Sequence, residues 1–132
     1  NSYGFRISFK DKKIVYSGDT SVSENVLSNA KDADILIHEV IAMSDKIYEK
    51  NKKLRDVDAT HTTVKQLISI LKKTKPKLTI LNHALLFGVS EKDVLGKIKK
   101  DYMGDVIFSY DLMSVDIGKE INIFNLGITN GK

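Results

Sequence analysis

The stretch TVKQLISILKKTKPKLTIL, residues 63–81, decides the fold because it encodes a helix and a strand in direct succession. Thr63 followed three residues later by Gln66 predicts a capping box, in which both side chains satisfy free backbone N–H groups at the helix start. Pro76 then stops the helix, and the apolar run 78–81 predicts a buried strand. Apolar residues with helical spacing predict one buried stripe on the helix: Val64, Leu67, Ile68 and Leu71.

Strands and helices alternate on both sides of this unit. Residues 3–9 alternate between apolar and polar side chains, which predicts a half-buried strand, and 14–16 return as its hairpin partner. The continuous apolar run 35–37 is typical of a strand covered on both faces. Further helices are expected at 23–30, about 41–55 and 90–98, and further strands at 106–110, 113–117 and 121–124.

This order of elements predicts an α/β domain in which helices cover a mixed sheet. A sheet with such apolar strands has to bury both of its faces. The expected helices can cover one face well, so the other face is expected to need a partner.

Length and composition exclude several classes of protein. The 132 residues suffice for about one domain, and their share of apolar residues, 42%, is ordinary for a globular protein. No apolar run approaches the ~20 residues of a membrane span, and no signal-like segment opens the chain, so a membrane protein is not expected and the cytoplasm is the default compartment. The absence of cysteine excludes disulfides and thiolate zinc sites.

The net charge of +4 comes largely from clusters of cations at 46–55, 72–77 and 97–100. Clustered lysines can bind nucleic acid, because phosphates release counterions when they are neutralised. Lysines also gather at helix C-termini, where they complement the helix dipole. Both interpretations stay open on the sequence alone.

Two polar residues follow buried strands at positions that suit a metal ligand. Asp19 lies in a Gly-Asp-Thr turn after the run 14–16, and His83 lies two residues after the run 78–81. The carboxyl ends of parallel strands meet at one edge of an open sheet, where ligands bind. Asp19 can bridge two metal ions or serve as a base there, or it can cap the following turn. His83 can be a ligand, or it can be a packed and hydrogen-bonded core residue.

The chain has three histidines, and the other two also stand beside predicted elements. His61 directly precedes the capped helix, where free N–H groups favour an anionic substrate, although histidine is also an ordinary residue at a helix start. His38 and Glu39 follow the strand at 35–37, and neighbours in a strand point to opposite faces, so only one of them can face a site. A carboxylate in such a place can hold an imidazole in one tautomer.

Taken in order, the signatures 17–20 (Ser-Gly-Asp-Thr), 36–39 (Leu-Ile-His-Glu), 60–63 (Thr-His-Thr-Thr) and 81–83 (Leu-Asn-His) resemble the C-terminal half of the metallo-β-lactamase superfamily. They look most like the branch that contains ribonuclease Z, arylsulfatase-like enzymes and cyclic-nucleotide phosphodiesterases. The resemblance extends over about residues 3–117. It implies one half of an αββα sandwich, which in the complete protein holds two metal ions, usually zinc, at one edge.

By this resemblance, Asp19 matches the carboxylate that bridges the two metals, and His83 matches the last metal-binding histidine. The His-x-His-x-Asp-His cluster that supplies most of the ligands in the superfamily is absent from the sequence. Two ligands do not fix a dinuclear site, because each ion usually takes at least three. The isolated chain is therefore expected to bind zinc weakly or not at all and to lack hydrolase activity. The strand-like start at Asn1 favours a single partial domain, residues 1–132, over a degenerate homologue.

The resemblance also implies the residues that act on the substrate. His61 matches the histidine that lies against the scissile phosphate and assists the departure of the leaving group. Glu39 matches the acidic residue that orients this histidine. Thr62 and His38 are expected to support the site from behind the residues that touch metal or substrate.

Two classes of function follow. The parent protein is expected to be a metal-dependent hydrolase that cleaves a phosphodiester or another ester with metal-bound hydroxide, and RNA is one such substrate. The alternative is a non-catalytic structural or interaction module derived from the same fold. Under both, the uncovered sheet face predicts contact with the missing N-terminal half or with a second copy in a homodimer.

Overall fold

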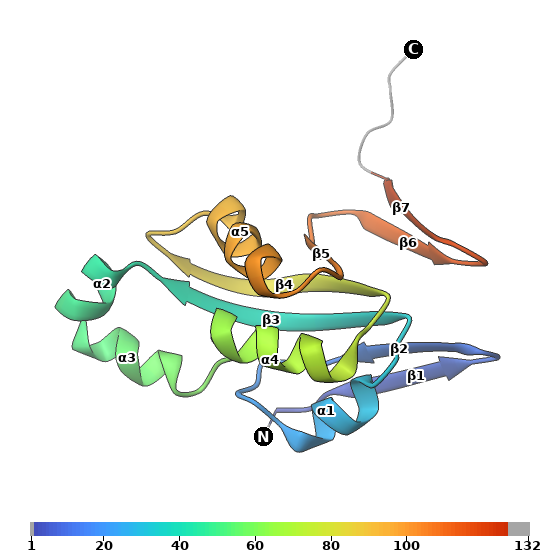
Figure 1. Ribbon diagram of the computed structural model, residues 1–132, viewed down its shortest axis with the longest axis horizontal. Helices are drawn as coiled ribbons and strands as arrows, with labels where there is room; N and C mark the ends of the chain where they lie inside the picture. Colours follow the sequence, from blue (N-terminus) through green and yellow to red (C-terminus); the bar gives the residue numbers. More distant parts are fainter. Residues whose placement is uncertain (1, 127–132) are drawn as a thin grey trace, which may run out of the picture.

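The computed structural model describes residues 2–126, which form a five-stranded sheet, a separate two-stranded hairpin and the helices that pack on the sheet (Figure 1). Asn1, on which the expectation of a fragment rests, lies outside the described residues. The strands are β1 (Phe5–Phe9), β2 (Lys12–Tyr16), β3 (Ile35–Met43), β4 (Leu78–Phe87), β5 (Asp105–Phe108), β6 (Met113–Ile117) and β7 (Ile121–Asn125). The helices are α1 (Glu24–Ala30), α2 (Asp45–Lys50), α3 (Lys52–Asp58), α4 (Val64–Thr74) and α5 (Glu91–Asp101).

The sheet is mixed, as the sequence predicts. Its strand order is β1-β2-β3-β4-β5, with β1 antiparallel to β2 and the other neighbours parallel. β6 and β7 pair with each other as an antiparallel hairpin. Within the described part of the chain, no helix is both long enough and apolar enough to cross a membrane.

Helix α4 begins and ends where its sequence predicts. The Thr63 hydroxyl accepts a hydrogen bond from the Gln66 N–H at 3.3 Å, and the Gln66 side chain accepts one from the Thr63 N–H at 2.9 Å, so the capping box is formed. The helix ends at Thr74, before Pro76, and its C-cap residue Lys75 has a left-handed φ of 48°. Local sequence alone therefore fixes both ends of the helix whose N-terminus faces the candidate site.

Alternate residues of β3 and β4 separate the two faces of the sheet. Leu36 and Leu81 pack in one cluster with buried residues of α1, α4 and α5. Their neighbours Ile35 and Ile80 belong to a second cluster, which includes residues of the hairpin β6–β7. Helices α1, α4 and α5 therefore cover one face, and the hairpin covers part of the other.

A stripe on the edge strand β1, formed by Phe5, Ile7 and Phe9, stays largely uncovered. These side chains are 61%, 57% and 69% exposed. Ile7 is paired directly with Ile14, which packs in the cluster on the hairpin side, so the β1 stripe lies on that same face. An incompletely covered sheet face is what the sequence predicts.

The prediction of a helix from about residue 41 is wrong at the start of that helix. Residues 41–43 belong to β3 and pair with residues 85–87 of β4. Helical structure begins only at Asp45 and is divided between the short helices α2 and α3. Pairing with a strand more than forty residues away outweighs the local preference, since it gives the backbone groups of 41–43 partners in the sheet.

Candidate functional site

The predicted site residues of β3 and β4 lie inside these strands and not at their ends. His38 pairs with Leu81 and Val40 pairs with Ala84, so two residues of β4, 82 and 83, lie opposite the single residue Glu39. His83 sits in this bulge with a left-handed φ of 45°. Bulges re-aim a side chain at the cost of local strain, and they recur beside active sites.

Glu39 is the centre of a buried hydrogen-bonded group at the start of α4. Its Oε2 lies 3.1 Å from His61 Nδ1, and its Oε1 accepts the Thr62 N–H at 2.6 Å. The Glu39 side chain is 1% exposed and that of His61 16%. With Nδ1–H donating to the carboxylate, Nε2 is the ring nitrogen left for a substrate.

Two influences act on the Glu39 carboxyl in opposite directions. Burial, the larger one, raises its pKa, because the charged form loses its hydration. The hydrogen bonds from Thr62 and His61 lower the pKa, because they stabilise the carboxylate. The positive charge of a protonated His61 therefore favours the ionised form of the buried Glu39 carboxyl.

Thr62 connects this group to the turn that carries Asp19. Its hydroxyl donates a hydrogen bond of 2.7 Å to the carbonyl oxygen of Thr20, and the residue is fully buried. The turn itself requires glycine at position 18, where φ is +64° and an added Cβ would collide with the Tyr3 carbonyl oxygen. The position of the Asp19 backbone is thus tied to the same residue that donates to Glu39.

Ser17 is a further member of the site that is not among the residues predicted from the sequence. Its buried hydroxyl accepts from the Glu39 N–H at 3.4 Å and donates to the Gly18 carbonyl oxygen at 2.7 Å. It stands in the same signature as Asp19, which is the only signal that could have pointed to it.

Asp19 and His83 also meet at this place. Asp19 Oδ2 lies 3.4 Å from His83 Nε2, and both side chains are about half exposed, at 53% and 43%. The rings of His83 and His61 are 5.8 Å apart between centroids. The structure therefore brings Asp19, His83, His61 and Glu39 together, although they come from four separate segments.

A zinc ion needs more ligands than this cluster offers. Carboxylate and imidazole are donors that suit zinc, so Asp19 and His83 fit as two of its ligands. Among residues 2–126, however, no three histidine, cysteine, aspartate or glutamate side chains are grouped closely enough to hold a metal ion. The described residues can contribute to a zinc site but do not complete one.

His38 stands apart from the other predicted site residues. It is fully buried, and its Nδ1 lies 2.8 Å from the carbonyl oxygen of Glu39, to which it donates. Burial lowers the pKa of its imidazole, and its Nε2 has no hydrogen-bond partner in the described part of the chain. Among residues 2–126, no hydrogen bond joins the His38 ring to the side chain of Asp19, His61 or His83.

Comparison with known proteins identifies what this arrangement is similar to. A family model described as a beta-lactamase superfamily domain matches residues 1–84. Ribonuclease Z of Methanosarcina acetivorans is 29% identical over 106 residues, which are 80% of this chain and 33% of that protein. Human zinc phosphodiesterase ELAC protein 2 is 38% identical over 71 residues, which are 54% of this chain and 8% of that protein.

Among solved structures, the metallo-beta-lactamase fold protein YhfI from Bacillus subtilis shares the fold. Its TM-score is 0.64 and its identity 23%, over 81% of this chain and 41% of that one. The chain spans about a third of the length of the ribonuclease Z relatives that it matches.

Proposed function

Because this chain belongs to the metallo-β-lactamase superfamily, we propose that it supplies part of the active site of a metal-dependent hydrolase whose substrate is RNA or another phosphodiester. The names of the relatives, ribonuclease Z and zinc phosphodiesterase, support this substrate class over other esters. The observation that carries the proposal is the buried Glu39 carboxylate, which holds His61 beside Asp19 and His83. In this proposal, residues 1–132 are one partial domain of the enzyme.

His61 is the proposed acid of the reaction. When it is protonated, its Nδ1–H donates to Glu39, and its Nε2–H is free to pass a proton to the leaving oxygen as the ester bond breaks. The Glu39 carboxylate stabilises the imidazolium and fixes the orientation of the ring. Thr62 holds the carboxylate in place through its backbone N–H.

Asp19 and His83 are the proposed metal ligands of this chain. Zinc bound there would polarise the phosphoryl group and lower the pKa of a water molecule. The Thr62 hydroxyl, through its bond to the Thr20 carbonyl oxygen, ties the turn that carries Asp19 to the segment that carries His61. The buried His38 is proposed to keep the strand beneath Glu39 in place.

Residues 1–132 in isolation should bind zinc only weakly and show no hydrolase activity, because Asp19 and His83 provide two ligands where each ion needs about three. Isothermal titration calorimetry with zinc measures this. Asp19→Ala should change the measured zinc affinity little, and so should the matched control Asp111→Ala at an exposed position. Tight, stoichiometric zinc binding that Asp19→Ala abolishes and Asp111→Ala retains would contradict the expectation.

The β1 stripe supports the second proposed partner, the remainder of the fold or another copy of this chain. In the isolated chain these side chains leave apolar surface open to water, so we expect a homodimer. Sedimentation equilibrium should give twice the chain mass, and the double variant Phe5→Ser, Phe9→Ser should give a monomer. The control Met103→Ser changes an apolar side chain that is 92% exposed elsewhere and should remain a dimer. A monodisperse wild-type monomer would rule the homodimer out.

A non-catalytic interaction module is the second candidate function, and the exposed β1 stripe is the observation that favours it. Hydrolysis of RNA by the full-length protein, lost on replacement of His61, would exclude this candidate.

A further inference from the structure

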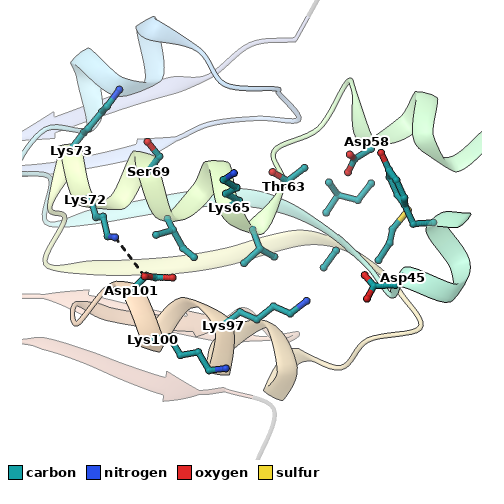
Figure 2. A pocket seen from close by; sticks show the side chains of 16 residues that line it. Asp45, Asp58, Thr63, Lys65, Ser69, Lys72, Lys73, Lys97, Lys100 and Asp101 are labelled. Atoms are coloured by element: carbon teal, nitrogen blue, oxygen red, sulfur yellow. Dashed lines mark ion pairs between the residues drawn. The ribbon is translucent and has the colours of Figure 1, made fainter.

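A groove separate from the candidate site runs between α4 and α5. Its volume is about 830 Å³, and it ends against the last residues of β3 and the helices α2 and α3 (Figure 2). Its apolar floor is formed by Ile41, Ala42, Met43, Val64 and Ile68. None of Asp19, Glu39, His61 or His83 lines it. The groove is nevertheless linked to the site through α4, because Thr63 lines the groove and lies two residues after His61.

Cations on both helices flank this groove. Packing of α4 against α5 brings together two lysine clusters that are about 25 residues apart in the sequence, at 72–73 and 97–100. The lining contains five lysines, namely Lys65, Lys72, Lys73, Lys97 and Lys100, and three aspartates, namely Asp45, Asp58 and Asp101. We call this surface the lysine groove.

Its charges are unevenly distributed, and lysines outnumber aspartates in its lining by five to three. Lys72 and Asp101 form an ion pair of 3.9 Å between α4 and α5. Asp45 and Asp58 lie on opposite sides of the other end of the groove, in α2 and α3 (Figure 2). Lys65, Lys97 and Lys100 are exposed, and no carboxylate of residues 2–126 lies within ion-pair distance of them. Lys97 has Asp93, one turn earlier in α5, as an electrostatic neighbour. No ion pair among the described residues has to be broken before these three cations bind a ligand.

The combination of cations and an apolar floor fits a single strand of nucleic acid. Such a strand presents phosphates, which lysines neutralise with release of counterions, and bases, which lie against apolar and aromatic side chains. The aromatic side chain of Tyr48 also lines the groove. An acidic polypeptide would also be attracted by the lysines, but an acidic residue carries no ring beside its charge, whereas every nucleotide pairs a phosphate with a base that can lie on that floor.

We propose that the lysine groove binds a single-stranded segment of the RNA substrate and so holds it on the α4 side of the active site. This proposal rests on the proposed function, since it names where that substrate is bound. The lysines act here by binding RNA and take no part in the chemical step.

The test compares two triple variants of the full-length protein. The groove variant is Lys65→Gln, Lys97→Gln, Lys100→Gln. The matched control is Lys31→Gln, Lys99→Gln, Lys119→Gln, which removes the same charge from exposed lysines that do not line the groove. Fluorescence anisotropy with a labelled single-stranded RNA, in the presence of a chelator, measures binding without turnover.

The groove variant should bind RNA roughly tenfold or more weakly than the control, and the slope of log K against log salt should fall by about 2, at about 0.7 per lost phosphate contact. Its kcat on a small chromogenic phosphodiester should equal that of the control. Equal RNA affinity and salt slope in the two variants would overturn the proposal. Unchanged RNA affinity with lost binding of poly-glutamate would instead assign the groove to an acidic protein segment.

Failure of the proposed function gives a different result. In that case the full-length wild type would cleave no phosphodiester at all, whereas the difference in RNA affinity between the two triple variants would still be measured.

Discussion

Replacement of His61 by alanine in the full-length protein should lower kcat for RNA cleavage by about 10²- to 10⁴-fold, the usual contribution of a positioned general acid. The reason is geometric: Nδ1 of His61 is held by the buried Glu39 at 3.1 Å, which orients the ring for proton transfer from Nε2. KM should change much less, since the lost proton transfer belongs to the transition state. Steady-state kinetics with a labelled RNA measures both constants.

Two further variants test whether the loss arises from the Glu39–His61 pair: Glu39→Gln changes the partner of His61, and Thr60→Ala is the control. The glutamine keeps a polar side chain of the same size but removes the charge that stabilises the imidazolium, so kcat should fall in the same direction as for His61→Ala. Thr60 is the exposed neighbour of His61, and its hydroxyl bonds only to the carbonyl oxygen of Val57 in the described residues. Thr60→Ala should keep wild-type kcat. A His61→Ala enzyme with wild-type kcat would remove His61 from the mechanism.

Replacement of Leu67 by alanine should lower the free energy of unfolding by about 2–5 kcal/mol, the range for buried leucines. Leu67 is fully buried on the α4 stripe and packs in the cluster that includes Leu36 and Leu81 of the sheet. The alanine leaves a cavity under the helix that carries Thr62 and His61 at its start. Urea denaturation of residues 1–132, followed by circular dichroism, measures the loss.

The control for packing is Leu112→Ala, because the Leu112 side chain is 64% exposed. Leu112→Ala should lower the free energy of unfolding by less than about 0.5 kcal/mol, as surface substitutions usually do. If Leu67→Ala were as mild as Leu112→Ala, the helix α4 would not be packed on the sheet as the structure describes.

The segment that the sequence predicts most accurately is 63–81, and the reason is that its signals are local. The capping box involves residues three apart, and Pro76 ends the helix whatever surrounds it. Strand β3 is the opposite case. Only its first three residues form an obvious apolar run, and its extension to Met43 depends on pairing with β4, which no local pattern reveals.

The candidate site likewise has features that the sequence reveals and features that it does not. The signatures that contain Asp19, Glu39, His61 and His83 could be recognised in the sequence, and the structure brings these residues together. What the sequence could not reveal is the bulge that carries His83, because a bulge exists only in the register of two strands. The link from Thr62 to Thr20 was equally hidden, since it joins residues 42 positions apart.

The most direct test of the account is the dependence of the His61→Ala effect on the leaving group. If His61 protonates the leaving oxygen, the substitution should slow RNA, whose leaving alkoxide is strongly basic, by about 10²-fold or more. It should leave kcat/KM for a nitrophenyl phosphodiester nearly unchanged, because that leaving group departs without a proton. An equal loss on both substrates would contradict the assignment of His61 as the acid and would indicate a role in binding or in holding the fold.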